Sequence, residues 1–235
     1  MSISFPYDFP LLKPAIVFLA VVPLVVCPLT AQTSDSAGKT HVIQCPDSPV
    51  AGQRPANTEC AILARKTFPR LPHGSIVWRL ETFPSMQTAQ QAQTSASVVV
   101  QGGGKIWLMS LSQPGQRSNG GSYVAEVGPL PLLPAAGYEL LVAEAYAGSD
   151  AMNLPHTHSG PEAWYLLAGK QCVETPDGAK KAKAGEGMFE PADTPMRLTI
   201  LAPDTRDAFF IVVHDPARPW NALSDWQPTD LCASQ

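Results

Sequence analysis

Short runs of alternating apolar and polar residues, separated by turn residues, dominate the first half of the chain after its N-terminal stretch. Residues 75–81 (SIVWRLE) alternate and predict a strand, and residues 97–101 and 105–111 predict two more on either side of Gly102–Gly104, a pattern typical of a β-hairpin. Residues 85–96 are rich in Gln and Ala and predict one short helix, and residues 113–121 predict a polar loop. This region is therefore expected to be rich in strands, with a single helix.

The strand pattern becomes denser after residue 137. Strands are expected over residues 138–146, 163–167, 171–175, 197–201 and 208–214, with a turn at residues 176–178. Turn signals at roughly 8–12-residue spacing are typical of a β-sandwich or small barrel. The chain has 24 prolines in 235 residues, about twice ordinary usage, and proline breaks helix interiors. The pattern predicts a mainly β protein and excludes a helical bundle.

The N-terminus resembles an export signal. Residues 14–29 carry no charge and follow Lys13, and a positive start, an apolar middle and a small residue at the cleavage point are typical of a secretory signal peptide. We expect cleavage after Ala31 and a flexible lead-in over residues 32–60. A lipoprotein box at Cys27, an uncleaved anchor and a buried N-terminal strand stay open as alternatives. The expected location is secreted or periplasmic, with no membrane association after cleavage.

Charge and cysteine content exclude several classes of protein. With 16 basic and 20 acidic residues and a pI near 5.7, the chain lacks the basic surface of a nucleic-acid binder. Removing the leader leaves Cys45, Cys60, Cys172 and Cys232, of which Cys45 and Cys60 are the easiest pair to close, although spacing does not assign connectivity. The absence of CxxC and GxSxG motifs removes the support for a zinc ribbon or a serine hydrolase.

Residues 154–169 (LPHTHSGPEAWYLLAG) carry the clearest chemical signal. His156 and His158 are two residues apart, so on a strand both imidazoles project from one face. The dipeptide at positions 160–161, Gly-Pro, then turns the chain and lets Glu162 return toward the histidines. Two histidines and one carboxylate bind divalent ions while leaving coordination positions open for water or substrate. The sequence predicts a metal site made of these three residues.

The pattern HxHx3Ex6G, formed by His156, His158, Glu162 and Gly169, resembles the first conserved motif of the cupin superfamily. A second motif, Gx5PxGxxH, is imperfectly matched from Gly185 onward, with Asp193 in place of its second glycine and Met196 in place of its histidine. The resemblance covers roughly residues 137–216. It implies a double-stranded β-helix, or jelly-roll barrel, that commonly holds Fe, Mn, Ni, Cu or Zn. It does not single out an activity, since cupins include dioxygenases, isomerases, sugar binders and storage proteins.

Met196 leaves three interpretations of the site open. The three ligands alone hold the ion, or Met196 adds a soft fourth ligand, which suits copper(I) better than harder ions, or the cluster binds no metal and is only a hydrogen-bonded polar group. Buried carboxylates are costly unless paired or metal-bound, which favours the metal.

Further candidate pocket residues are those that strand alternation or motif position places near the metal. Each of them also has a plainer explanation as core, turn, surface or capping residue. They are Met196, Trp164, Leu166, Asp193, Arg197 and His214.

We therefore predict five segments: a signal peptide (1–31), a lead-in (32–60), a strand-rich N-terminal α+β region with one short helix (61–134), a cupin barrel (135–220) and a C-terminal tail (221–235). A degenerate duplicate of the barrel over residues 61–134 is an alternative. The expected function is metal-dependent conversion of a small organic molecule, as in an oxygenase or isomerase. The alternatives are a small-ligand or partner-binding module without turnover and a scaffold with a dead site, and a homodimer is also open.

Overall fold

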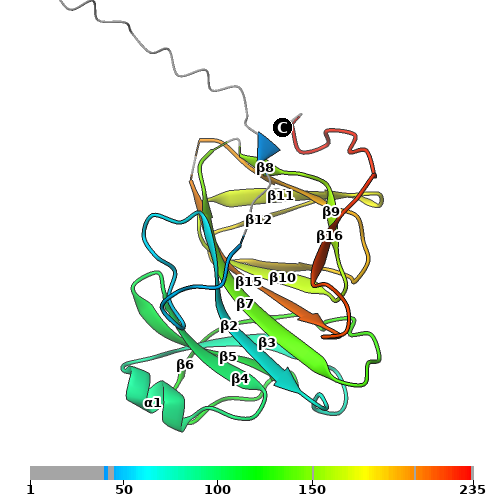
Figure 1. Cartoon of the computed structure of the whole chain (residues 1–235). Helices are drawn as coiled ribbons and strands as arrows, with labels where there is room; N and C mark the ends of the chain where they lie inside the picture. Colours follow the sequence, from blue (N-terminus) through cyan, green and yellow to red (C-terminus); the bar gives the residue numbers. More distant parts are fainter. Residues whose placement is uncertain (1–39, 42–44, 150, 204, 234–235) are drawn as a thin grey trace, which may run out of the picture. The chain divides into compact units, whose positions relative to one another are not determined.

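The computed structural model describes residues 40–41, 45–149, 151–203 and 205–233 (Figure 1). The predicted signal peptide (1–31) and residues 32–39 and 42–44 of the predicted lead-in lie outside the described residues. Within the described part of the chain, no helix is long and apolar enough to cross a lipid bilayer.

Three β-sheets lie in layers, which Figure 1 shows from the top to the bottom of the view. The upper sheet has the order β1-β8-β14-β11-β12, the central sheet β13-β10-β15-β7-β2, and the lower sheet β4-β5-β3-β6, and a small ladder joins β16 to β9. The upper-sheet strands are Thr40–His41 (β1), Met152–Asn153 (β8), Arg197–Ile200 (β14), Lys170–Thr175 (β11) and Gly178–Lys183 (β12). The central-sheet strands are Gly187–Glu190 (β13), Glu162–Ala168 (β10), Arg206–His214 (β15), Tyr138–Ala147 (β7) and Cys60–Phe68 (β2). The lower-sheet strands are Ser97–Gly102 (β4), Lys105–Ser112 (β5), Val77–Phe83 (β3) and Ser122–Val127 (β6), and the ladder strands are His156–His158 (β9) and Asn221–Leu223 (β16).

The central sheet is buried on both faces. Along β15, Phe210 and Val212 belong to the core between the central and upper sheets, whereas Phe209 and Ile211 belong to the core against the lower sheet. Successive side chains of a strand point to opposite faces, so a strand covered on both sides is apolar without alternation. The run AFFIVV at positions 208–213 has this composition for that reason.

Eight strands follow a jelly-roll path between two facing sheets. In the central sheet β7-β15-β10-β13 are neighbours, and in the upper sheet β8-β14-β11-β12 are neighbours. The chain thus crosses repeatedly from one sheet to the other, which is the eight-stranded jelly-roll arrangement. Among the described strands, no hydrogen-bonded ladder joins the two sheets into a closed barrel, so the predicted barrel is an open pair of sheets.

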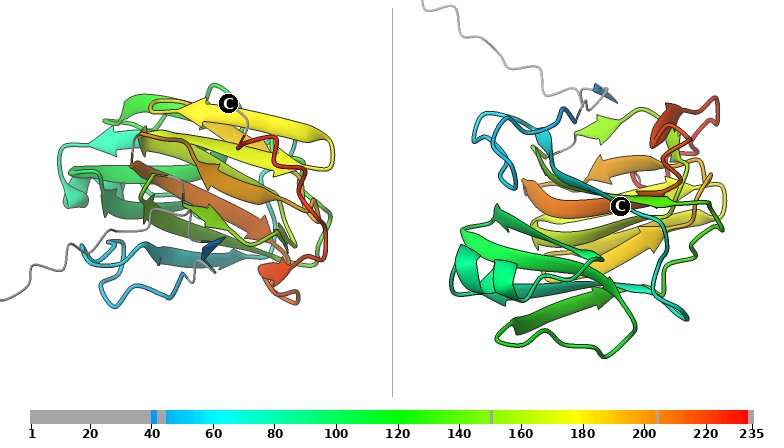
Figure 2. Two further views of the ribbon diagram at one scale, coloured as in Figure 1. Left: turned by 90° about the horizontal axis from the view of Figure 1, so that it is seen from above. Right: turned by 60° about the horizontal axis from the view of Figure 1, so that its bottom comes forward.

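Residues 60–134 contribute to two different sheets. β2 pairs with β7 along the edge of the central sheet, and β3 to β6 form the lower, four-stranded antiparallel sheet. The lower sheet packs on the outer face of the central sheet through a core that includes Trp78, Trp107 and Phe209. The strands β3 to β6 thus form a covering layer, and they do not repeat the paired-sheet arrangement (Figure 2).

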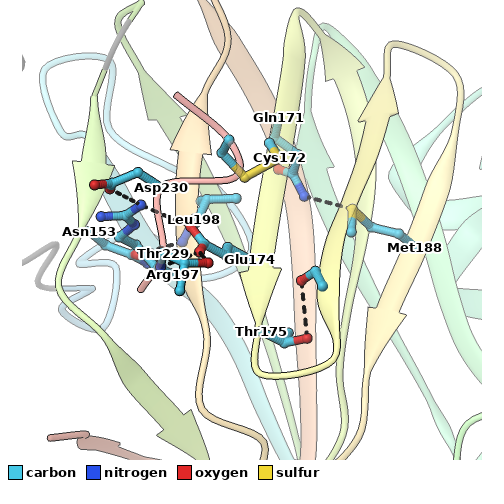
Figure 3. Close-up of a disulfide and its surroundings, with 12 residues drawn as sticks. Asn153, Gln171, Cys172, Glu174, Thr175, Met188, Arg197, Leu198, Thr229 and Asp230 are labelled. Atoms are coloured by element: carbon cyan, nitrogen blue, oxygen red, sulfur yellow. Dashed lines mark hydrogen bonds and ion pairs between the residues drawn. A yellow bond between two sulfur atoms is a disulfide. The ribbon is translucent and has the colours of Figure 1, made fainter. Parts of the chain in front are cut away.

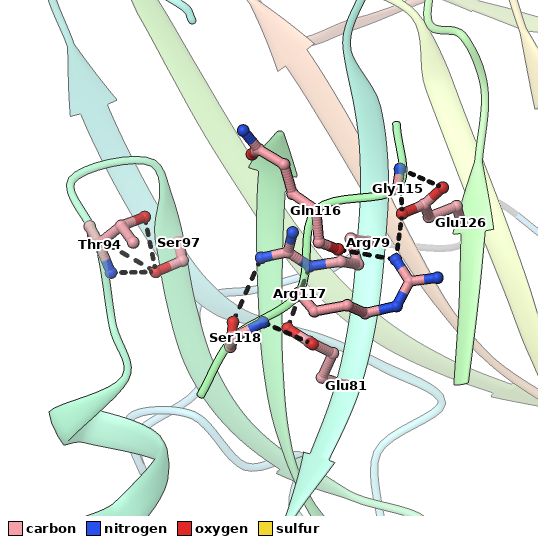
Figure 4. A network of polar contacts seen from close by, with 9 residues as sticks. All are labelled: Arg79, Glu81, Thr94, Ser97, Gly115, Gln116, Arg117, Ser118 and Glu126. Atoms are coloured by element: carbon pink, nitrogen blue, oxygen red, sulfur yellow. Dashed lines mark hydrogen bonds and ion pairs between the residues drawn. The ribbon is translucent and has the colours of Figure 1, made fainter. Parts of the chain in front are cut away.

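The predicted hairpin of residues 97–101 and 105–111 is confirmed by the pairing of β4 with β5. The predicted helix is shorter than expected: α1 spans Met86–Gln91, with Ser85 as its N-cap. After it, the Thr94 amide donates to Ser97 Oγ at 2.7 Å (Figure 4). Such local side-chain bonds compete with a helix, which is why the prediction of a helix continuing to Ala96 was wrong.

Two disulfides hold the ends of the described chain. Cys45 bonds to Cys60, the pair that was easiest to close, and Cys172 bonds to Cys232. Near the second disulfide, the buried Glu174 carboxylate accepts hydrogen bonds from the Thr229 amide (2.6 Å), the Thr229 hydroxyl (2.9 Å) and Arg197 Nη2 (2.9 Å) (Figure 3). These contacts fix the C-terminal segment on the outer side of the upper sheet.

Candidate metal centre

A short strand and a tight turn position the three predicted ligands. His156 and His158 lie on β9, and Glu162 is the first residue of β10. Between them Gly160 passes so close to β15 that an added Cβ would lie 1.9 Å from the Val213 carbonyl oxygen. Only glycine fits there, and the chain bends at residues 159–160 and returns toward the histidines, as predicted.

The three side chains converge. One ligand atom from each of His156, His158 and Glu162 can be chosen so that all lie within 4.8 Å of one another. The two imidazole rings are 4.9 Å apart and nearly perpendicular, at 87°. His158 and Glu162 are 2% and 4% exposed, so the cluster lies away from bulk solvent.

Backbone carbonyls orient both imidazoles. His156 Nδ1 lies 2.9 Å from the Leu154 carbonyl, and His158 Nδ1 lies 3.1 Å from the Trp220 carbonyl. A carbonyl only accepts, so Nδ1 carries the proton in each ring and Nε2 is the nitrogen free to bind a cation. Metal-binding histidines usually have such a partner on the other ring nitrogen.

The contact between His158 and Glu162 suits a shared cation. His158 Nε2 lies 2.8 Å from Glu162 Oε2, yet neither atom has a hydrogen-bond partner of acceptable geometry. Ligand atoms that bind one ion at about 2.1 Å lie roughly 3–3.5 Å apart. Small side-chain movements would bring the widest separation, 4.8 Å, into that range. The donor set of two imidazoles and one carboxylate therefore fits a divalent transition metal.

The pKa values of the two histidines shift in opposite directions. Burial lowers the pKa of His156, and the neighbouring His158 lowers it further. Burial alone would also lower the pKa of His158, but the Glu162 carboxylate outweighs it and raises that pKa above its ordinary value.

A pocket of about 90 Å³ opens beside the cluster. Its wall is mostly apolar, with the Cys45–Cys60 disulfide, Trp164, Phe210 and Trp220 among the lining residues. Trp220 stacks on His158 with ring centroids 5.5 Å apart. This composition, apolar with few polar groups, is typical of a small-molecule site.

Of the other predicted pocket residues, only Trp164 lines this pocket. Leu166 and Met196 are fully buried in the core between the central and upper sheets. Met196 pairs with His156 through two backbone hydrogen bonds of 2.9 and 3.0 Å, and it is not among the residues that line the pocket.

Three predicted residues point elsewhere. Asp193 forms an ion pair with Arg218 at 2.6 Å, and Arg197 binds Glu174. Asp193 has φ 57°, a left-handed conformation that aspartate tolerates better than most residues, which explains how it replaces the glycine of the second motif. His214 lies 3.2 Å from Glu139 and lines a different cavity.

Arg206 and Trp220 are among the lining residues that were absent from the prediction. Arg206 is the first residue of β15 and shares the inward face with Ala208 and Phe210. The sequence could have indicated Arg206, because strand alternation places this charged residue on the same face as the apolar Ala208 and Phe210. It was missed because the predicted strand began only at residue 208. Trp220 comes from the segment before β16, and nothing in the sequence around it indicates that it stacks on His158.

Comparisons with known proteins concern the fold. No protein-family model and no curated protein matches the chain. Among solved structures, a cupin superfamily protein from Desulfitobacterium hafniense matches with 10% identity and a TM-score of 0.31, over 32% of this chain and 68% of that one. A conserved double-stranded β-helix protein from Klebsiella pneumoniae matches with 17% identity and a TM-score of 0.33, over 37% and 71%. A mutant of Bacillus subtilis oxalate decarboxylase matches with 15% identity and a TM-score of 0.32, over 36% and 24%.

The strand order decides the fold. The neighbours β7-β15-β10-β13 face β8-β14-β11-β12, and the two histidines and the glutamate lie at the start of β10 and the strand before it. The two sheets have the eight-stranded jelly-roll arrangement that the resemblance to cupins implies. The lower sheet and β2 are additions to this eight-stranded core, and the candidate metal centre lies where the first cupin-like motif falls in the chain.

Proposed function

We propose that this chain is an exported cupin-domain protein that binds a divalent metal through His156, His158 and Glu162 and converts a small organic molecule in the adjoining pocket. The observation that carries the proposal is the convergence of the three side chains, of which His158 and Glu162 are buried and His156 partly buried, with both Nδ1 atoms held by carbonyls and His158 Nε2 2.8 Å from Glu162 Oε2. The donor set suits Fe, Mn, Ni, Cu or Zn.

A metal bound by three protein ligands keeps positions open and supplies Lewis-acid polarisation of a substrate oxygen. The protein's own contribution is orientation and exclusion of water. The Leu154 and Trp220 carbonyls hold the imidazoles in one tautomer, and Trp164, Phe210 and the stacked Trp220 keep the pocket apolar. An oxygenase-like or isomerase-like reaction fits this arrangement.

Export is supported by the two disulfides, because disulfides persist in oxidising compartments. The leader that would direct export was inferred from the sequence of residues 14–29. Expression of the full chain in an exporting host, followed by N-terminal analysis of the product, tests cleavage after Ala31.

A binding module without turnover is the second candidate. It is favoured by Met196, which occupies the place of the second-motif histidine and is buried in the core beside the pocket. In that case the pocket would take up a ligand and release it unchanged.

Elemental analysis of the purified mature protein tests the metal proposal. We expect close to one equivalent of a divalent transition metal in the wild type and its loss in His156→Ala. His214→Gln is the matched control, because it changes another histidine that lies in a different cavity, and it should retain the metal. A wild type that stays metal-free after incubation with each candidate ion would refute the proposal, and turnover tests on the loaded protein then separate the enzyme from the binding module.

A further inference from the structure

Arg206 is a buried cation in the wall of the candidate pocket. Arg206 is 1% exposed, and it lines the same pocket as His156, His158 and Glu162. Nε donates to Gln171 Oε1 at 2.9 Å, and Nη1 donates to the Ala145 carbonyl at 3.3 Å. These two bonds hold the guanidinium in one orientation.

The third nitrogen of this side chain, Nη2, is buried and has no hydrogen-bond partner. Among the residues that the structure describes, no carboxylate oxygen forms an ion pair with Arg206 within 4.0 Å. Leaving a buried charged donor without a partner is unfavourable. Burial lowers the pKa of Arg206 to about 10, so the side chain still carries its charge at neutral pH.

The charged residues that line the pocket favour the binding of an anionic ligand. Glu162 is the lining carboxylate, and Arg206 is the one arginine or lysine among the described residues that line the pocket. A divalent cation at the histidines would leave the described residues that line the pocket with a net positive charge, because Glu162 is the carboxylate among them and offsets one of three positive charges. A ligand with one negative charge reduces that excess and gives Nη2 an acceptor.

The unpartnered guanidinium nitrogen of Arg206 favours a carboxylate over a phosphate as the anionic group. Nη2 offers its N–H groups in the guanidinium plane, and arginine donates strong charge-assisted hydrogen bonds to carboxylate oxygens. Phosphate groups are usually surrounded by several cationic or backbone donors, and this mostly apolar wall has a single cationic side chain. We therefore propose that Arg206 binds the carboxylate of the small molecule, so that the substrate or ligand class is a small carboxylic acid. This inference rests on the proposed function for the identity of the pocket as the ligand site.

Carboxylate recognition is tested first in metal-free protein, so that a carboxylate cannot be held by the ion. Propionate and its neutral analogue propionamide are titrated into the full mature chain, and the side-chain ¹⁵N resonances of the arginines are followed by NMR. We expect propionate, and not propionamide, to saturate a shift of the Arg206 resonance. The preference for propionate should fall by about tenfold or more in Arg206→Gln, because hydrogen bonds to charged groups contribute strongly.

Arg218→Gln is the control, because it removes an exposed arginine that pairs with Asp193 outside the pocket. It should keep the wild-type preference. If Arg206→Gln does not fold, the wild-type titration still decides the matter through the Arg206 resonance. Equal binding of the two compounds, no binding of propionate, or a preference that persists in a folded Arg206→Gln would each overturn the inference.

Metal content, measured separately, distinguishes the two proposals. A protein that binds metal without preferring propionate refutes the role of Arg206 and leaves the metal centre standing. A protein that prefers propionate through Arg206 but never binds metal refutes the metal centre and leaves the carboxylate site standing.

Discussion

The turn that brings Glu162 to the histidines depends on a glycine with no room for a side chain. A Cβ at Gly160 would lie 1.9 Å from the Val213 carbonyl oxygen, 2.6 Å from the Val213 carbonyl carbon and 2.8 Å from the His214 Cα. All three atoms belong to the backbone of β15, which is paired along its length with β7 and β10. They cannot rotate away as a side chain can.

We predict that Gly160→Ala destabilises the protein. Ordinary contact distances would require the turn and β15 to separate by roughly 1.5 Å, and forced overpacking of this kind costs about 1–3 kcal/mol, with the upper end expected against backbone. For a chain of this size, about 3 kcal/mol corresponds to a fall in Tm of roughly 6–12 °C. The measurement is urea and thermal unfolding followed by circular dichroism.

Gly148→Ala is the matched control, because a Cβ there has no atom within 4 Å. The displaced turn in Gly160→Ala should also reduce the copurified metal, and Gly148→Ala should not. If the free energies of unfolding of the two variants agree within about 0.5 kcal/mol, the close approach does not constrain the turn and the reasoning is wrong.

Three further predictions concern groups outside the pocket. Burial raises the pKa of Glu144 from 4.5 to about 7, so the folded chain retains a proton that the unfolded chain loses, and stability should fall by up to about 3 kcal/mol as pH rises through that window. Urea unfolding at a series of pH values should show this fall of stability with pH in the wild type and a clearly smaller fall in Glu144→Gln. Equal falls in the two proteins would contradict the raised pKa of Glu144. Glu174→Ala should cost about 1–3 kcal/mol and speed amide exchange over residues 225–233, because it removes the buried acceptor of two hydrogen bonds from Thr229 and one of the two acidic partners of the partly buried Arg197, and unchanged exchange would argue against a fixed segment. Asp193→Gly should change stability by less than about 1 kcal/mol, because relief of the left-handed φ offsets the loss of an exposed ion pair, whereas Asp193→Val should be clearly less stable by the same unfolding assay.

The part of the site that the sequence predicted is the part built locally. His156, His158 and Glu162 lie within seven residues, and strand alternation followed by a Gly-Pro turn is enough to place them together. The β4–β5 hairpin was predictable for the same reason, since its turn residues and apolar runs are adjacent.

The rest depends on tertiary packing. Arg206 and Trp220 reach the site from β15 and from the segment before β16, which lie beside β9 and β10 only in the folded chain. The strand β2 escaped prediction because a bulge between Ile62 and Ala64 breaks its alternation. Another missed strand, β12, is an edge strand with a polar sequence, GAKKAK, and charged edge strands are common because they prevent edge-to-edge pairing.

The most direct test is an anomalous-scattering map from crystals of the mature protein grown with each candidate divalent ion in turn. We predict one strong peak at about 2.0–2.2 Å from Nε2 of His156, Nε2 of His158 and a carboxylate oxygen of Glu162. A map with no peak there for any of the ions, and with His158 Nε2 hydrogen-bonded directly to Glu162 instead, would contradict it.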